Sequence, residues 1–105
     1  MSILAVIPAR LGATRLPRKP LRPLGGAPLV VRVWERVRSL GLADRVVVAT
    51  ESPEVLEVLA VHGAEGVMTS DLHPSGTDRV AEVAGRPEFS GFDVVVNVQG
   101  DEPFM

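Results

Sequence analysis

The strongest constraint on the fold is the alternation of short apolar runs with segments of helical periodicity along the chain. The runs read ILAVIP (3–8), RVVVAT (45–50), GVM (66–68) and FDVVVNVQG (92–100). Continuous apolar runs such as the first two are typical of strands buried on both faces of a parallel sheet. The alternation therefore predicts right-handed β-α-β crossovers, with helices on both faces of a mainly parallel sheet.

Three segments between these runs are expected to be helices. Residues 25–41 place six apolar side chains at helical spacing, namely Leu29, Val30, Val33, Trp34, Val37 and Leu40. A second helix is expected within 52–63, with Ser52 as N-cap and Pro53 at the first helical position. Residues 77–84 predict a short third helix. Gly41 and Gly63 are expected to end the first two helices, because glycine tolerates the left-handed conformation found there.

Length and composition favour one small domain. The chain has 105 residues, of which 46% are hydrophobic and 23% charged, and its formal net charge of −2 gives no reason to expect a nucleic-acid partner. The absence of cysteine excludes disulfides and thiolate metal sites. The first residues, MSILAVIPAR, lack the basic region and the long apolar run of a signal peptide or membrane span. A cytoplasmic protein without membrane insertion is therefore expected.

The loop after the first apolar run concentrates positive charge. Within thirteen positions it carries Arg10, Arg15, Arg18, Lys19 and Arg22. The chain has neither G-x-G-x-x-G nor the P-loop pattern, which argues against a dinucleotide dehydrogenase and a P-loop NTPase. Arg10, Arg15 and Lys19 are candidates for holding a triphosphate, since guanidinium groups grip phosphate oxygens in pairs. The alternative is a solvated basic loop, and Arg18 and Arg22 are interpreted as surface charge.

Two further stretches have residue types suited to a nucleotide site. In QGDEP, Asp101 follows the last apolar run and a glycine, so its carboxylate is a candidate ligand for Mg²⁺; a simple turn is the alternative. In HPSGTDR, residues 75–77 run into the predicted third helix, whose free amides are able to contact a base, ribose or phosphate. An ordinary helix cap is the alternative there.

Four stretches together resemble a known family. IPARLGATRLPRKPL, VVATES, MTSDLHPSGTDRVAEV and VVNVQGDEP, in this order and spacing, are similar to the amino-terminal half of the 3-deoxy-manno-octulosonate (Kdo) cytidylyltransferases, or CMP-Kdo synthetases. The resemblance implies a three-layer α/β/α, Rossmann-like nucleotide-diphospho-sugar transferase fold, here truncated. It also implies that CTP and Kdo give CMP-Kdo and pyrophosphate with Mg²⁺, for lipopolysaccharide biosynthesis.

The same resemblance implies catalytic and substrate-binding roles. Arg10 and Lys19 would bind the CTP phosphates and offset charge on the departing pyrophosphate, with Arg15 beside them. Asp101 matches the metal-binding aspartate of the family, and Gln99 matches a position that faces the sugar. The expected partners are thus CTP and Kdo, and the expected cofactor is Mg²⁺.

The cytidine pocket is also implied by resemblance. Its expected members are Ala9, Ser75, Gly76, Thr77 and Arg79. An arginine at position 18 departs from the small residue common in the family, which affects only the path of the local loop.

The resemblance implies that residues 1–105 are the amino-terminal nucleotide-binding part of a longer domain. Family chains are more than twice this length, and the remainder supplies most of the sugar pocket and the contacts of a homodimer. A half-site with little turnover alone is therefore expected. The alternatives are an acylneuraminate-type cytidylyltransferase and a nucleotide-binding module without catalysis. The module would tolerate loss of Asp101, whereas an active enzyme would not.

Overall fold

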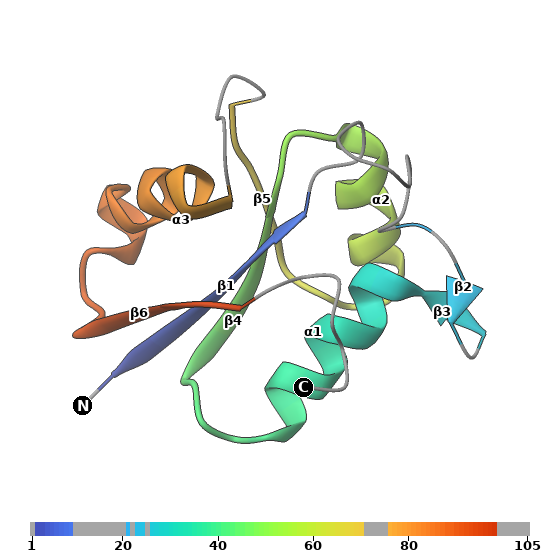
Figure 1. Cartoon of the computed structure of the whole chain (residues 1–105), viewed down its shortest axis with the longest axis horizontal. Helices are drawn as coiled ribbons and strands as arrows, with labels where there is room; N and C mark the ends of the chain where they lie inside the picture. The colour runs from blue at the N-terminus through green and yellow to red at the C-terminus, as the bar shows by residue number, and fades with distance from the viewer. Residues whose placement is uncertain (1, 10–20, 22, 25, 71–75, 99–105) are drawn as a thin grey trace.

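A four-stranded parallel sheet forms the centre of the computed structural model, which describes residues 2–9, 21, 23–24, 26–70 and 76–98 (Figure 1). Its strands are β1 (Ile3–Ala9), β4 (Arg45–Thr50), β5 (Gly66–Met68) and β6 (Val94–Asn97). They lie in the order β5-β4-β1-β6, and every pair is parallel. The mainly parallel sheet expected from the alternating apolar runs is confirmed.

Helices cover both faces of the sheet, which makes three layers (Figure 1). The helices are α1 (Leu29–Ser39), α2 (Pro53–Val61), α3 (Gly76–Ala84) and the short 3₁₀ helix η2 (Pro87–Phe89). Alternate residues of a strand point to opposite faces, so Ala5 and Ile7 of β1 pack with α1 and α2. Leu4 and Val6 pack on the other face with α3. Both faces of β1 are therefore buried, as its continuous apolar sequence predicts.

The helix ends follow the local sequence signals. Ser52 caps α2 by accepting a hydrogen bond on Oγ from Val55 N at 3.3 Å, and Pro53 is the first helical residue. Gly41 and Gly63 adopt φ of 69° and 75° just after α1 and α2. Only glycine adopts this left-handed conformation without steric cost, which explains why both helices end where they were expected to end.

Two features of the α1 region differ from the sequence expectation. A small antiparallel hairpin, β2 (Pro23–Leu24) with β3 (Ala27–Pro28), precedes the helix and leaves it eleven residues long. Leu40 was expected on the apolar face, but it lies beyond the last helical residue and is exposed. Trp34 is in the core as expected, and its indole nitrogen donates to the Val46 carbonyl at 3.0 Å.

β6 is one edge of the described sheet and is shorter than the apolar run that predicted it. It spans Val94–Asn97, while residues 99 and 100 of that run lie outside the described residues. Val95 packs with the α3 side, whereas Val94 and Val96 are exposed on the other face. In the described part of the chain, no helix has the length and apolar character needed to span a membrane.

Candidate functional site at the carboxyl edge of the sheet

The candidate site lies where the parallel strands end. β1 ends at Ala9, β4 at Thr50, β5 at Met68 and β6 at Asn97, all on one edge of the sheet. Crossovers through α1 and α2 place β4 and β5 on one side of β1, whereas the crossover through α3 on the opposite face places β6 on the other side (Figure 1). This reversal of strand order next to β1 is a topological switch point. Ligands of open parallel sheets bind at the carboxyl ends of strands at such a point.

Buried polar side chains gather at this edge. Among the described residues they are Thr50, Ser52, Thr69 and Arg79. Thr50 Oγ1 accepts from the backbone nitrogen of Ser52 at 3.2 Å, so the turn from β4 into α2 is fixed by a side chain. Burial of polar groups is costly unless they are hydrogen-bonded, and each of these four side chains makes a hydrogen bond. The apolar layers above and below β1 and β4 end at this polar edge.

Arg79 is the most deeply buried charged residue of the described chain. Its exposed fraction is 0%, and it extends from the first half of α3 toward the end of β5. Its Nη1 donates to Thr69 Oγ1 and, at 3.0 Å, to the Ser70 carbonyl. Hydrogen bonds from an ionised donor are about twice as strong as neutral ones, so Arg79 ties α3 firmly to the segment that leaves β5.

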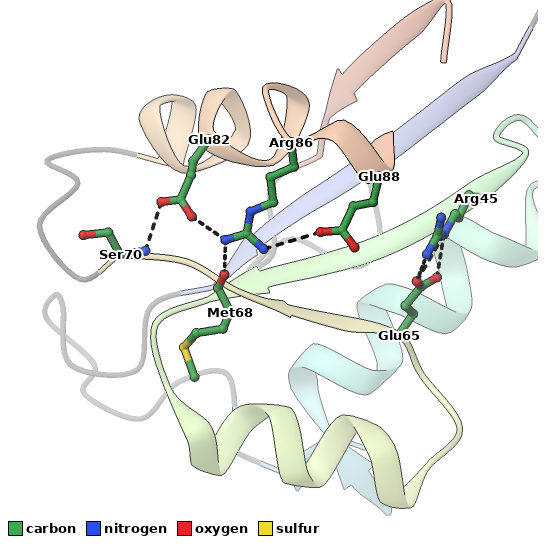
Figure 2. A network of polar contacts seen from close by, with 7 residues as sticks. All are labelled: Arg45, Glu65, Met68, Ser70, Glu82, Arg86 and Glu88. Atoms are coloured by element: carbon green, nitrogen blue, oxygen red, sulfur yellow. Dashed lines mark hydrogen bonds and ion pairs between the residues drawn. The ribbon is translucent and has the colours of Figure 1, made fainter. Parts of the chain in front are cut away.

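Two more side chains from the α3 region reach the same segment (Figure 2). Glu82 accepts from Ser70 N at 3.0 Å, and Arg86, just beyond α3, donates to the Met68 carbonyl. The two side chains also form an ion pair, with Arg86 Nη2 at 2.5 Å from Glu82 Oε2. Glu88 adds a longer contact of 4.0 Å to Arg86. The Glu82–Arg86 pair therefore binds the backbone at the carboxyl end of β5, on the edge that faces away from β4.

A second ion pair lies at the opposite end of β5. Arg45, the first residue of β4, hydrogen-bonds the Glu65 carboxylate through Nε at 3.0 Å and 3.1 Å, as well as through Nη2 (Figure 2). The bond to Glu65 raises the pKa of the Arg45 guanidinium above its ordinary value. Arg45 also stacks over the Phe89 ring at 4.9 Å. This pair resembles Glu82–Arg86 in composition, but it is at the amino edge, away from the candidate site.

The sequence-predicted site residues that the structure describes lie on two elements, β1 and α3. Ala9 is the last residue of β1 and is buried, Gly76 and Thr77 are the first two residues of α3, and Arg79 is one turn further along. The others lie outside the described residues, and they are Arg10, Arg15, Lys19, Ser75, Gln99 and Asp101.

Sequence reasoning missed the contacts around the end of β5. Thr69, Glu82 and Arg86 were not singled out, although each contacts the segment that leads to the predicted nucleotide stretch. The four-residue spacing of Glu82 and Arg86 is a signal for an ion pair on a helix. This spacing does not indicate that Glu82 and Arg86 contact the end of β5, which lies more than ten residues earlier in the chain.

The implied metal has no ligand set among the described residues. No group of three or more His, Asp or Glu side chains comes together in the part of the chain that the structure describes. Asp101, the carboxylate that the sequence predicts for Mg²⁺, lies outside that part. An aspartate carboxylate is a chemically suitable donor for this hard cation.

Sequence comparison connects nearly the whole chain with one family model. Residues 4–105 match the model described as Cytidylyltransferase. The curated 3-deoxy-manno-octulosonate cytidylyltransferase of Gemmatimonas aurantiaca is 71% identical over 105 residues, which is 100% of this chain and 41% of the relative. The enzyme of the same name from Polynucleobacter necessarius is 56% identical over 102 residues, covering 97% of this chain and 40% of its own length.

Structure comparison agrees with the sequence comparison. A solved CMP:2-keto-3-deoxy-manno-octonic acid synthetase complexed with CTP superimposes with a TM-score of 0.91 at 39% identity. The superposition covers 100% of this chain and 42% of the synthetase. The expected fold is therefore confirmed, and the chain spans about two fifths of the length of the proteins that it matches.

Proposed function

The chain belongs to the cytidylyltransferase family, and from that premise we propose that it is the nucleotide-binding part of a CTP-dependent sugar nucleotidyltransferase. The reaction would join CTP and Kdo to give CMP-Kdo and pyrophosphate. The observation that carries the proposal is that Ala9, at the end of β1, and Arg79, bound to the segment that leaves β5, both lie at the carboxyl edge of the sheet, where β1 also borders the topological switch point. The two curated relatives, 71% and 56% identical, favour Kdo over an acylneuraminate as the sugar.

The proposed roles divide the site into phosphate, base and sugar regions. Arg10, Arg15 and Lys19 follow β1 directly in sequence and would hold the triphosphate with point charges and guanidinium forks. Gln99 and Asp101 follow β6, the strand next to β1, and would face the sugar and the metal. Because β1 and β6 are adjacent parallel strands, residues that follow them would be expected at one edge of the sheet.

The base region would lie between the end of β1 and the start of α3. Its proposed members are Ala9, Ser75, Gly76, Thr77 and Arg79. The first amides of a helix have no partner within the helix, so the start of α3 offers donors for a base, ribose or phosphate. The buried guanidinium of Arg79, a residue of the same helix, binds Thr69 and Ser70 just after β5.

Catalysis in this proposal comes from positioning and charge. The anomeric hydroxyl of the sugar would attack the α-phosphorus in line with the departing pyrophosphate, without a covalent enzyme intermediate. Arg10 and Lys19 would offset charge on the pyrophosphate as it leaves. Bound Mg²⁺ would supply further charge neutralisation, with Asp101 as a ligand.

The proposed reaction also suggests a pathway, a cellular compartment and an oligomeric state. CMP-Kdo would feed lipopolysaccharide synthesis in the cytoplasm, and a protein with the full length of the relatives would act as a homodimer. Residues 1–105 alone would bind CTP yet release little pyrophosphate, because the relatives have more than half of their length beyond the matched part.

Calorimetric titration with CTP and Mg²⁺ tests the proposal directly. We expect saturable binding that is weaker for UTP. Arg10→Ala should weaken CTP binding by roughly 10- to 100-fold, the worth of one charge-assisted hydrogen bond. Arg18→Ala is the matched control, because it removes the same charge from the same loop at a position interpreted as surface. Equal losses in the two variants, or no binding by the folded wild-type chain, would contradict the proposal.

A further inference from the structure

Glu82 and Arg86 together form a polar clamp on the outer side of β5, which we call the β5 clamp. Glu82 accepts from Ser70 N at 3.0 Å, Arg86 donates to the Met68 carbonyl, and the two side chains pair at 2.5 Å (Figure 2). Both are mostly buried, with exposed fractions of 26% and 29%. Each member therefore holds the other in place while it holds the strand.

The backbone groups that the clamp binds lie on the side of β5 that faces away from β4. Thr69 N donates to Thr50 O of β4 at 2.8 Å, and Glu65 O accepts from Val48 N of β4 at 2.9 Å. Odd-numbered residues of β5 thus face β4. Alternation then directs the polar backbone groups of Met68 and Ser70 to the edge of the sheet. Unpaired edge groups are exposed to water or to another strand, so the clamp closes this edge with side chains.

Helical geometry directs the clamp and Arg79 to the same segment. Positions 79, 82 and 86 are separated by three and four residues, a spacing that places them on one face of a helix. All three contact the backbone or side chains of Met68–Ser70. The segment after β5 is consequently bound by two residues of α3, Arg79 and Glu82, and by Arg86, which lies two residues beyond the end of the helix.

We infer that Glu82 and Arg86 are positioning residues for nucleotide binding, a role that rests on the proposed function. Their contacts fix Ser70, at the exit of β5, relative to the start of α3 at Gly76. Ser70 and Gly76 are the described residues on either side of the sequence stretch that leads to the proposed cytidine-contacting amides. A misplacement of about 1 Å is enough to cost about 100-fold in the rate of a positioned reaction, so loss of the clamp should likewise weaken the contacts that hold CTP.

The Arg45–Glu65 pair provides a matched control. It joins the same two residue types, with exposed fractions of 40% and 38%, but lies at the opposite end of β5, at the amino edge of the sheet. Loss of either pair removes one ion pair of comparable exposure. Only loss of the β5 clamp should move the start of α3 relative to the carboxyl edge.

The experiment compares Glu82→Ala and Arg86→Ala with Glu65→Ala and Arg45→Ala. We expect CTP affinity in the first two variants to fall by roughly 5- to 100-fold. The control variants should stay within about twofold of the wild type, since they alter no group near the site. Hydrogen exchange of the Ser70 amide provides a second measurement that needs no nucleotide, and it should accelerate in both clamp variants and in neither control.

Each result decides a separate point. Equal CTP affinity in clamp and control variants would overturn the positioning role. If the wild-type chain does not bind CTP, the proposed function fails for this chain, and Ser70 exchange alone decides whether the clamp holds the segment. If the alanine variants do not fold, Glu82→Gln replaces them. Its neutral acceptor should still leave Ser70 exchange faster than in the wild type, and unchanged exchange would refute the clamp.

Discussion

Replacement of Thr69 by valine removes one hydroxyl from the carboxyl edge while the size and shape of the side chain are kept. Thr69 Oγ1 accepts a hydrogen bond from Nη1 of Arg79. The exposed fractions of the two residues are 5% and 0%, so water has no access to replace the missing acceptor. The variant therefore leaves a buried, charged donor with one fewer partner.

The size of the effect follows from these contacts. A hydrogen bond to a charged group contributes about 1.5–3 kcal/mol to stability. Arg79 retains its bond to the Ser70 carbonyl at 3.0 Å, so we expect a loss near the lower end, about 1.5–2 kcal/mol. For a domain of this size the melting temperature should fall by roughly 6–12 °C.

Urea unfolding followed by circular dichroism measures this loss. Thr69→Ser is the control, because it keeps the hydroxyl and removes only a methyl group, at a cost of about 1 kcal/mol or less. The valine variant should be less stable than the serine variant by about 0.5–2 kcal/mol. Equal stability of the two variants would show that the hydroxyl is not a significant partner of Arg79.

Three further substitutions test other contacts by the same unfolding assay. Trp34→Phe should cost about 1–3 kcal/mol, because the buried Val46 carbonyl loses its indole donor; no loss would contradict that contact. Gly66→Ala should cost about 1–3 kcal/mol, since the new Cβ would lie 2.6 Å from Cδ2 of Leu56, and truncation of that leucine should relieve part of the cost. Glu65→Gln should cost under about 1 kcal/mol, because the pair is partly exposed, and a larger loss would mean that it is more than a surface pair.

The elements of the fold were predictable because their signals are local. The β-branched runs at 3–8 and 45–50 form strands buried on both faces, and Ser52, Pro53 and the glycines at 41 and 63 mark helix ends as expected. Such signals act within a few residues and depend little on the rest of the chain. The motifs around them are specific enough that the residues alone indicate the family.

The strand order and the contacts between distant residues were not predictable in the same way. Placement of β6 beside β1 pairs residues about ninety positions apart, such as Ile3 with Val94, and no local pattern specifies that pairing. The hairpin of β2 and β3 is only two residues long on each side and carries a proline in each strand, so it has no strand signal.

Burial of Arg79, within the candidate site, also depends on contacts between distant residues that local sequence patterns do not predict. In the sequence it stands in an apparent helix start with charged neighbours, and only its resemblance to a family position suggested a role. Its contacts to Thr69 and Ser70 arise because α3 packs across the end of β5. Tertiary packing, which the sequence pattern does not specify, converts a nominal surface charge into a buried one.

Binding of CTP at the carboxyl edge is tested most clearly by locating the nucleotide on the chain. In an amide-correlation NMR titration of the ¹⁵N-labelled chain with CTP and Mg²⁺, we expect saturable shifts at Ala9, Ser70 and Gly76, on the carboxyl edge. Arg45 and Glu65, at the amino edge, should remain unchanged. Shifts confined to the amino edge, or none in a chain that retains the dispersed spectrum of a folded protein, would contradict the claim that the carboxyl edge binds CTP.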